Sequence, residues 1–269
     1  MALNNPETTT ASASRRNWTN FWRHHLGEWH GRWTRYEPSG DVMESFESAR
    51  HFTADAEHNE VHQRNRYLYD DGKDIAEAWD YNVVDHSLSD GFAHPAHPSM
   101  RGFAFEDGAA TWLIPRLDVE QFAAFELFLA KGETRHSVGL VYGQKGALVR
   151  TASIREHRGS ASTSPWTKAI AQVPAWQPDG EWHGEEWRLR PDLSLAATGT
   201  MAWTWVPSES RSVYFPDDII LRCPARLVVG QAFSVEVIWM INKVELQLIA
   251  ADYDAAAALV GLRHQRLSR

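Results

Sequence analysis

The sequence predicts an all-β protein in which one antiparallel barrel unit occurs twice, with a larger N-terminal copy and a reduced C-terminal copy. The segment Gly27-Glu28-Trp29-His30-Gly31 recurs without change at residues 180–184. Short alternating apolar and polar segments, separated by turn signals, follow each repeat, and this pattern is typical of strands. The 13 Trp, 11 Phe and 7 Tyr residues also suit pleated surfaces.

Further markers in the same order support the duplication, since fixed-order repeats indicate repeated structural units. The turn Phe105-Glu106-Asp107-Gly108 resembles Phe215-Pro216-Asp217-Asp218, and each copy ends in a basic stretch, at 154–158 and 262–266. Between the two kinds of marker the second copy is shorter by about 40 residues, the length of several strands. We therefore expect the second copy either to form a reduced barrel or to complete a sheet begun by the first copy.

A short helix is expected before each copy. In the first helix, Asn17 is the expected cap, and Trp18, Phe21, Trp22 and His25 follow it at helical spacing. In the second, Ser164-Pro165-Trp166 combines a cap residue with proline at the first helical position. The strands of the first copy are expected at 42–52, 60–69, 75–84, 100–105, 109–114, 122–130, 137–142 and 148–154. Those of the second are expected at 186–189, 200–206, 219–223, 233–240 and 245–251.

These elements divide the chain into four parts. Residues 1–16 are polar and are expected to form a flexible tail, and residues 17–158 form the first copy. Residues 159–179 are a linker with the second short helix, and residues 180–269 form the shortened copy. Consecutive strands with little helix between them predict an antiparallel meander, and closure into a barrel removes exposed edges.

Composition excludes several classes of function. The net charge is −8 and no cluster of Lys and Arg exists, so nucleic acid is not an expected partner. No apolar stretch approaches the ~20 residues of a membrane span, and the N-terminus lacks an apolar signal region. Cys223 is the only cysteine, which favours the cytoplasm.

No cofactor is expected, because the chain has no glycine-rich phosphate loop, no nucleophile elbow and no Cys-x-x-Cys motif. His94 and His97 form the tightest histidine pair, but prolines make this segment a loop and no third ligand is evident. A metal site is therefore not expected either.

A family resemblance adds to this interpretation. Gly27-Glu28-Trp29, its repeat at 180–182, the segment 62–67, the turn 105–108 and the segment 153–156 together resemble a lipocalin-like (calycin) family of unknown function, frequent in cyanobacteria and plastid-bearing lineages. The resemblance spans roughly residues 18–253 and implies a duplicated calycin barrel without an activity to transfer. Asp218 stands where the family tends to have glycine, and strand 247–252 lacks the basic residues of the family.

A closed sheet of modest size leaves a cavity fit for one ligand. The preferred hypothesis is therefore binding of a hydrophobic or amphipathic small molecule, namely a pigment, an isoprenoid or a lipid-derived metabolite. The alternative is a cofactor-independent cyclase, isomerase or hydratase acting on such a molecule. A third hypothesis is a partner-binding protein, and homo-oligomer formation is left open.

The candidate site residues come from the predicted strands. Glu44, Glu77 and His62 are the candidate catalytic acid–base groups, since proton transfer needs a positioned carboxyl or imidazole. The candidate ligand-binding residues are Arg64, Arg66, Trp79, Tyr81, Trp112, Trp203 and Trp205. The polar face with His62, Arg64 and Arg66 is also compatible with a solvated outer wall, and Trp203 and Trp205 with plain core.

Overall fold

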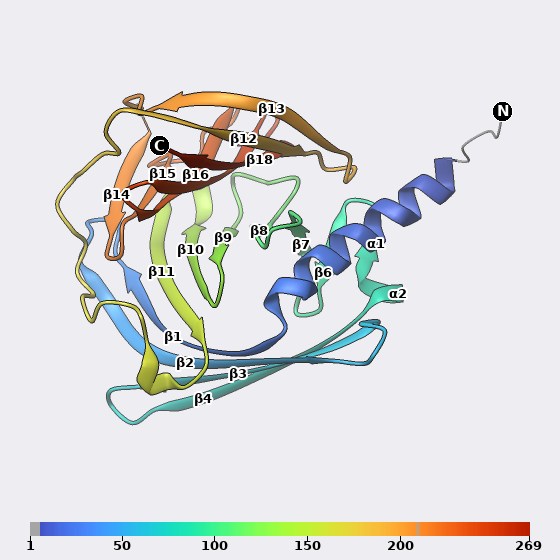
Figure 1. Cartoon of the computed structure of the whole chain (residues 1–269), viewed down its shortest axis with the longest axis horizontal. Coiled ribbons are helices and arrows are strands. Elements are labelled where there is room, and N and C mark those ends of the chain that lie inside the picture. The colour runs from blue at the N-terminus through green and yellow to red at the C-terminus, as the bar shows by residue number, and fades with distance from the viewer. Residues whose placement is uncertain (1–5, 209) are drawn as a thin grey trace.

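The computed structural model describes residues 6–208 and 210–269, with side chains from residue 12 onward. Within these ranges the chain forms two antiparallel sheets, of eleven and seven strands (Figure 1). The first contains, in spatial order, β4 (Asp74–Asn82), β3 (Glu60–Tyr69), β2 (Val42–Ala54), β1 (Gly27–Tyr36), β11 (Leu148–Arg158), β10 (Thr134–Tyr142), β9 (Ala123–Lys131), β8 (Ala110–Leu113), β7 (His97–Ala104), β6 (Gly91–His94) and β5 (Ser87–Leu88). The second contains β13 (Leu195–Thr204), β12 (Glu181–Leu189), β18 (Leu259–Ser268), β17 (Glu245–Tyr253), β16 (Phe233–Asn242), β15 (Ile219–Cys223) and β14 (Arg211–Phe215).

The strand order confirms the predicted duplication. The run β2-β1-β11-β10-β9-β8-β7 of the first sheet has the same connectivity as the whole second sheet, β13-β12-β18-β17-β16-β15-β14. The first copy adds β3, β4, the short helix α2 (Val83–His86), β5 and β6. These elements account for the segment that the second copy lacks.

The repeated glycines have a steric reason. A Cβ atom on Gly31 would lie 2.2 Å from the carbonyl oxygen of Arg155, and one on Gly184 would lie 1.9 Å from that of Arg266. Real Cβ atoms do not approach backbone so closely, and a packed sheet cannot move aside without cost. The identical segments at 27–31 and 180–184 therefore record the same close strand contact in each copy.

Helix α1 (Pro6–His25) closes one end of the first barrel (Figure 1). Its apolar side chains at helical spacing, Trp18, Phe21 and Trp22, are buried against strand residues that include Phe52 and Tyr81. The sheet itself ends at β4 and β5, and α2 links these two edges. The barrel is thus nearly closed around its circumference and filled at the α1 end.

Two expectations about the helices differ from the structure. Helix α1 begins at Pro6, so residues 6–16 are helical instead of a flexible tail, while residues 1–5 lie outside the described residues. The run 7–16 contains neither Gly nor Pro, which allows the helix to extend upstream. Asn17 is not a cap: its amide bonds the backbone of Gly102 and Ala104 and ties α1 to β7.

The second predicted helix is absent from the described linker, which follows a short 3₁₀ turn (Ala161–Thr163) and has neither helix nor strand from 164 to 180. The guanidinium of Arg155 donates to the carbonyl oxygens of Thr167 and Ala169, at 3.0 and 2.7 Å. A side chain thus satisfies carbonyl groups that a helix would need for its own hydrogen bonds.

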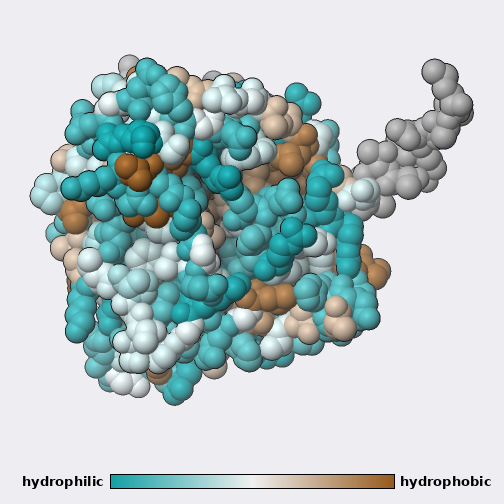
Figure 2. All heavy atoms as spheres, in the orientation of Figure 1, coloured by the Kyte–Doolittle hydropathy of each residue, from teal (hydrophilic) through white to brown (hydrophobic). Residues whose placement is uncertain are grey.

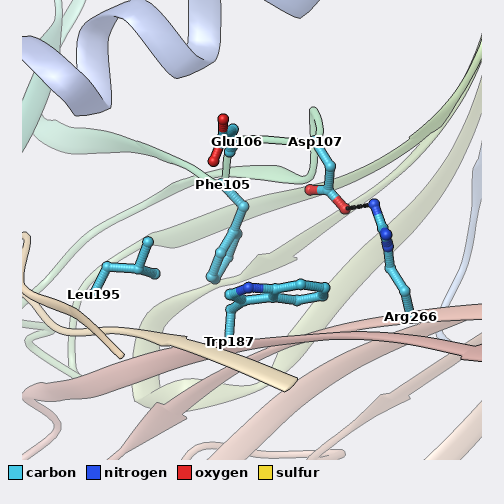
Figure 3. Close-up of a pocket in the computed structure, with 6 residues that line it drawn as sticks. All are labelled: Phe105, Glu106, Asp107, Trp187, Leu195 and Arg266. Atoms are coloured by element: carbon cyan, nitrogen blue, oxygen red, sulfur yellow. Dashed lines mark ion pairs between the residues drawn. The ribbon is translucent and has the colours of Figure 1, made fainter. Parts of the chain in front are cut away.

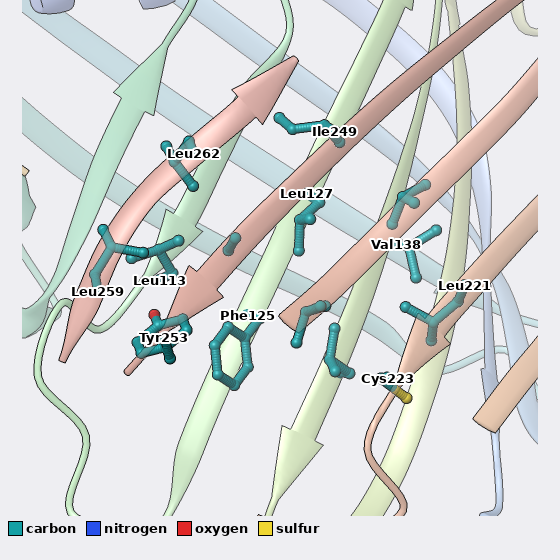
Figure 4. Close-up of a cluster of buried hydrophobic side chains, with 14 of the residues drawn as sticks. Leu113, Phe125, Leu127, Val138, Leu221, Cys223, Ile249, Tyr253, Leu259 and Leu262 are labelled. Atoms are coloured by element: carbon teal, nitrogen blue, oxygen red, sulfur yellow. The ribbon is translucent and has the colours of Figure 1, made fainter. Parts of the chain in front are cut away.

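The second sheet packs against the outer face of β8–β11, and the two copies share one core. Figure 4 shows Phe125 of β9 beside Tyr253 of the second sheet, and the centroids of these two rings lie 5.8 Å apart. Cys223 lies in the same core, fully buried, and burial raises the pKa of its thiol to about 11. The division into copies at 17–158 and 180–269 stays a prediction about folding units.

None of the described helices is both long and apolar enough to cross a membrane. The face of the molecule seen in Figure 2 is mostly hydrophilic, with apolar residues in small separate groups.

Candidate functional site in the first barrel

The first barrel contains a cavity of about 550 Å³ at the end opposite α1. On β2, β3 and β4 the residues nearest α1 are Phe52, Val61 and Tyr81, whereas the cavity is lined by earlier or later residues of the same strands, such as Glu44 and Tyr67. The strands therefore present an apolar plug at one end and an accessible lumen at the other. This lumen is the candidate functional site.

Aromatic side chains form much of the wall. Trp79 of β4 and Trp112 of β8, both predicted as ligand-binding residues, line the cavity together with His94. The His94 ring lies 5.4 Å from that of Trp79 and 5.1 Å from that of Trp112. Burial, together with His97 and His86, lowers the pKa of His94 to about 4, so its imidazole is neutral at pH 7.

Tyr81, the third predicted aromatic residue of this group, lies behind the wall and begins a chain of hydrogen bonds along β3. Its hydroxyl donates to Gln63 Oε1 at 2.9 Å, Gln63 Nε2 donates to Asn65 Oδ1 at 3.1 Å, and Asn65 Nδ2 donates to the Tyr67 hydroxyl oxygen at 2.8 Å. Gln63, Asn65 and Tyr67 all line the cavity. Burial raises the pKa of Tyr67, so its hydroxyl keeps its proton.

A buried ionic network forms the floor of the cavity. Arg50 donates from Nε and Nη2 to the two carboxylate oxygens of Glu156, and Arg135 Nε donates to Glu156 Oε2 at 2.7 Å. Burial alone would raise the pKa of Glu156, but the Arg135 and Arg50 guanidiniums lower it to about 2. Arg135 also donates to His25 of α1, which burial keeps neutral by lowering its pKa well below the usual value.

The second copy lacks this network. Because Gly31 pairs with Glu156 and Gly184 pairs with Leu267, Leu267 occupies the position of Glu156 in the second sheet. By the same registers, Trp203 stands in place of Arg50 and Leu246 in place of Arg135. The buried charges are therefore particular to the first copy, and the equivalent position of the second is apolar.

Glu126 is a lining residue that the sequence analysis missed. It lies on β9 directly opposite Trp112, and Ser137 Oγ donates to its Oε1 at 2.8 Å. Burial raises the pKa of its carboxyl. The signal was present in the sequence, since a single glutamate in the apolar strand 123–131 indicates a buried carboxyl with a particular environment.

Two of the three predicted acid–base candidates line the cavity, and the third lies outside it. Glu44 and Glu77 both line the cavity; Glu44 pairs with Arg35, and Glu77 is exposed at the rim. His62 lies on the outer surface, where its Nδ1 is 2.8 Å from Asp80 Oδ1.

Arg64 and Arg66 also lie outside the barrel, paired with Asp80 and Asp74. Strand β3 turns its odd-numbered residues inward and its even-numbered residues outward, because side chains alternate across a sheet. His62, Arg64 and Arg66 therefore do not line the cavity, and the solvated outer wall is the correct interpretation of this face.

Trp203 of β13 and Trp205, which follows the end of that strand, belong to the second copy and do not line this cavity. Trp203 packs against the apolar cluster that contains Trp182, and the Arg222 guanidinium carbon lies 3.8 Å from the ring centroid of Trp205. Among the side chains of residues 12–208 and 210–269, no group of three His, Cys, Asp or Glu is arranged to hold a metal ion.

A smaller cleft of about 170 Å³ lies where the two copies meet (Figure 3). Phe105 and Asp107 come from the first copy, and Trp187 and Arg266 from the second. Asp107 Oδ2 is 2.8 Å from His264 Nε2 and 3.5 Å from Arg266 Nη1. Burial alone would raise the pKa of Asp107, but these two partners lower it to about 2.

Asp107→Asn is expected to lower the free energy of unfolding by an amount that depends on pH. Since folding lowers the pKa from 3.8 to about 2, the ionised carboxylate contributes about 2 kcal/mol above pH 4, and this contribution is lost as the pH falls towards 2. Urea unfolding at pH 2–7 should show a gap between the wild type and the variant at pH 7 that narrows in acid. Glu106→Gln, at the exposed neighbouring position, is the control; a pH-independent gap for Asp107→Asn would contradict the assignment.

Comparisons with known proteins agree with this fold. A DUF3598-family protein of unknown function from Nostoc punctiforme PCC 73102 is similar in structure, with a TM-score of 0.69 and 17% identity over 94% of this chain and 98% of that chain. An S-type phycobiliprotein lyase from Guillardia theta matches 58% of this chain and 99% of its own at 14% identity, but its TM-score of 0.37 does not establish a shared fold. No curated protein matches the sequence.

The likeness to the Nostoc protein extends over both copies of the barrel unit, and at its level of identity it concerns the fold alone. The sequence profile described as "Domain of unknown function (DUF3598), N-terminal" matches residues 14–161, which include the C-terminal part of α1 and the whole first sheet. Since this match covers more than half of the 269 residues, the chain belongs to the DUF3598 family.

Proposed function

We propose that the first barrel binds one hydrophobic or amphipathic small molecule, such as a pigment, an isoprenoid or a lipid-derived metabolite. The observation that carries this proposal is the lumen of about 550 Å³, which lies within the ~300–1,000 Å³ usual for small-molecule sites. Trp79 and Trp112 offer an apolar wall, and Gln63, Asn65 and Tyr67 offer polar groups at defined positions. An amphipathic molecule fits this combination better than a purely apolar one.

The architecture around the cavity supports the same proposal. Helix α1 fills one end with Trp18, Phe21 and Trp22, so a ligand enters from the other end and meets a closed floor. This arrangement is what the lipocalin-like resemblance led us to expect, and we extend the proposal to membership of the calycin group. The single cysteine supports a cytoplasmic location.

Native mass spectrometry of the protein purified from its own source tests the proposal. We expect a population heavier than the polypeptide by the mass of one small molecule, which is released on denaturation and rebinds the stripped protein at one molecule per chain. A separate sample of the stripped protein, incubated with a control extract, gives the background binding. Protein that carries nothing and rebinds nothing from its own extract would overturn the proposal.

A second candidate function is cofactor-independent acid–base catalysis on the bound molecule, and Glu126 favours it. A carboxyl whose pKa is raised by burial keeps its proton to higher pH and can deliver it to a substrate. Glu126 lines the cavity beside Trp112, whose π face would stabilise a developing positive charge.

Glu126→Gln is expected to lower the rate of any such turnover by about 10²–10⁴-fold and to leave ligand binding in place. The amide keeps the size of the side chain but cannot transfer a proton. The measurement is product formation from the retained compound by the wild type and the variant. Glu44→Gln, which changes the rim pair with Arg35, is the matched control. Equal turnover in wild type and Glu126→Gln would exclude Glu126 as the acid.

A further inference from the structure

We propose that the ligand of the first barrel carries a carboxylate, and that Arg50 and Tyr67 bind it at the floor of the cavity. This inference rests on the proposed function and specifies the chemistry of the ligand. It follows from two hydrogen-bond donors that have no acceptor among the described residues, and from two arginines that share one carboxylate.

Arg50 is the first of these groups. Its side chain is 6% exposed and lines the cavity. The guanidinium uses Nε and Nη2 for Glu156, and within the described ranges of the chain its Nη1 has no hydrogen-bond acceptor. Because Arg50 lines the lumen, a ligand oxygen there would accept from this nitrogen in a charge-assisted hydrogen bond.

The charge of the floor is also unbalanced. Two guanidiniums, those of Arg50 and Arg135, share the single carboxylate of Glu156. The next carboxyl is that of Glu126, and burial raises its pKa and so favours its neutral form. A positive charge held out of water attracts an anion more strongly than a surface charge does.

Tyr67 supplies a second donor; it lies on β3 two residues from Asn65, which pairs with Arg50 of β2. The chain of hydrogen bonds from Tyr81 ends with Asn65 donating to the Tyr67 oxygen, so the Tyr67 proton points to no acceptor among the described residues. Trp33 connects the two donors: its ring lies 5.5 Å from that of Tyr67, and the Arg50 guanidinium carbon lies 5.3 Å from its centroid.

A carboxylate matches this arrangement in charge and in shape. Its two oxygens can accept from a guanidinium and a hydroxyl at once, and hydrogen bonds between charged groups are stronger than neutral ones. The other charges of the lumen do not compete for it, since Arg35 pairs with Glu44 and the rim carries both Lys73 and Glu77. A cationic ligand group would meet the unbalanced arginines and is disfavoured.

The test uses two fluorescent amphipathic probes, 1-pyrenebutyrate and its primary amide. In the amide an uncharged NH₂ group replaces one oxygen of the carboxylate. We expect the wild type to bind the carboxylate at least about tenfold more tightly than the amide in fluorescence titrations at pH 7.5, because an ionic hydrogen bond is worth more than a neutral one. Tyr67→Phe should weaken binding of the carboxylate by roughly tenfold and change binding of the amide far less.

Tyr69→Phe is the matched control, because Tyr69 lies two residues along the same face at the rim and does not end the hydrogen-bond chain. It should leave the preference unchanged. Equal affinities of the wild type for both probes would overturn the carboxylate and leave cavity binding intact, as would a retained natural compound without an acidic group. A protein that binds neither probe and retains no compound would instead overturn the proposed function.

Discussion

Glu156→Gln is expected to lower the free energy of unfolding by about 3–5 kcal/mol, because it leaves two buried guanidiniums without their counter-charge. Glu156 is fully buried and accepts hydrogen bonds from both Arg50 and Arg135. The amide can still accept one bond from each arginine, but it cannot offset their charge. Urea unfolding followed by circular dichroism measures the loss.

Asp74→Asn is the control for Glu156→Gln, because Asp74 also pairs with an arginine, Arg66, but on the solvated outer wall. Exposed ion pairs contribute little to stability, so its unfolding midpoint should stay close to that of the wild type. Similar losses for the two variants would contradict the assignment of Glu156 as the centre of a buried network.

The second copy suggests a rescue that tests the physical reason. Its equivalent positions hold Trp203, Leu246 and Leu267, and well-packed apolar groups often replace buried ions at no cost. The triple change Arg50→Trp, Arg135→Leu and Glu156→Leu should therefore be more stable than Glu156→Gln alone. It should also lose the preference for 1-pyrenebutyrate over its amide, since it removes the charge that we assign to ligand recognition.

Much of the fold could be predicted from the sequence because its determinants are local or repeated. The alternation of Glu60–Tyr69 and the apolar run Ile219–Cys223 predict β3 and β15 with the boundaries that the structure has. Gly31 and Gly184 recur because the same close strand contact leaves no room for a Cβ atom in either copy. The missing segment of the second copy then follows from length alone.

The ends of the two copies were harder to predict because their partners are distant in sequence. The basic stretches at 154–158 and 262–266 are strand residues of β11 and β18. Arg155 pairs with Asp217, and His264 and Arg266 both contact Asp107. A single sequence does not display these pairings. Without the partners, charged runs favour surface over strand.

The site was partly predictable for a related reason. A strand with polar residues on both faces has a clear period, but the period does not decide which face is inside. In β3 the inward face carries Gln63, Asn65 and Tyr67, which hydrogen-bond to one another, and the outward face carries His62 and Arg64, which both contact Asp80. Internal satisfaction of hydrogen bonds decides the choice, and it is visible only in three dimensions.

Trp22→Ala is the second substitution with a large expected effect, a loss of about 3–5 kcal/mol in the free energy of unfolding. Trp22 is fully buried in the plug, and its ring centroid lies 5.0 Å from that of Tyr81 and 6.1 Å from that of Phe52. Alanine would leave a space that rigid barrel strands cannot close. The loss of stability therefore includes both the lost transfer free energy of the indole ring and the cost of the cavity. Urea unfolding again measures the loss.

Trp205→Ala is the matched control, because Trp205 is half-buried at the edge of the second copy and its loss opens a space that water can enter. Its cost should be clearly smaller than that of Trp22→Ala, and equal costs would contradict the role of α1 as a plug. Trp22→Ala should also weaken 1-pyrenebutyrate binding, although Trp22 does not line the cavity. The reason is that Tyr81 packs on Trp22 and begins the hydrogen-bond chain that orients Tyr67. Since no residue of α1 from Trp18 to Trp22 lines the lumen, a change in affinity would have to pass through that chain.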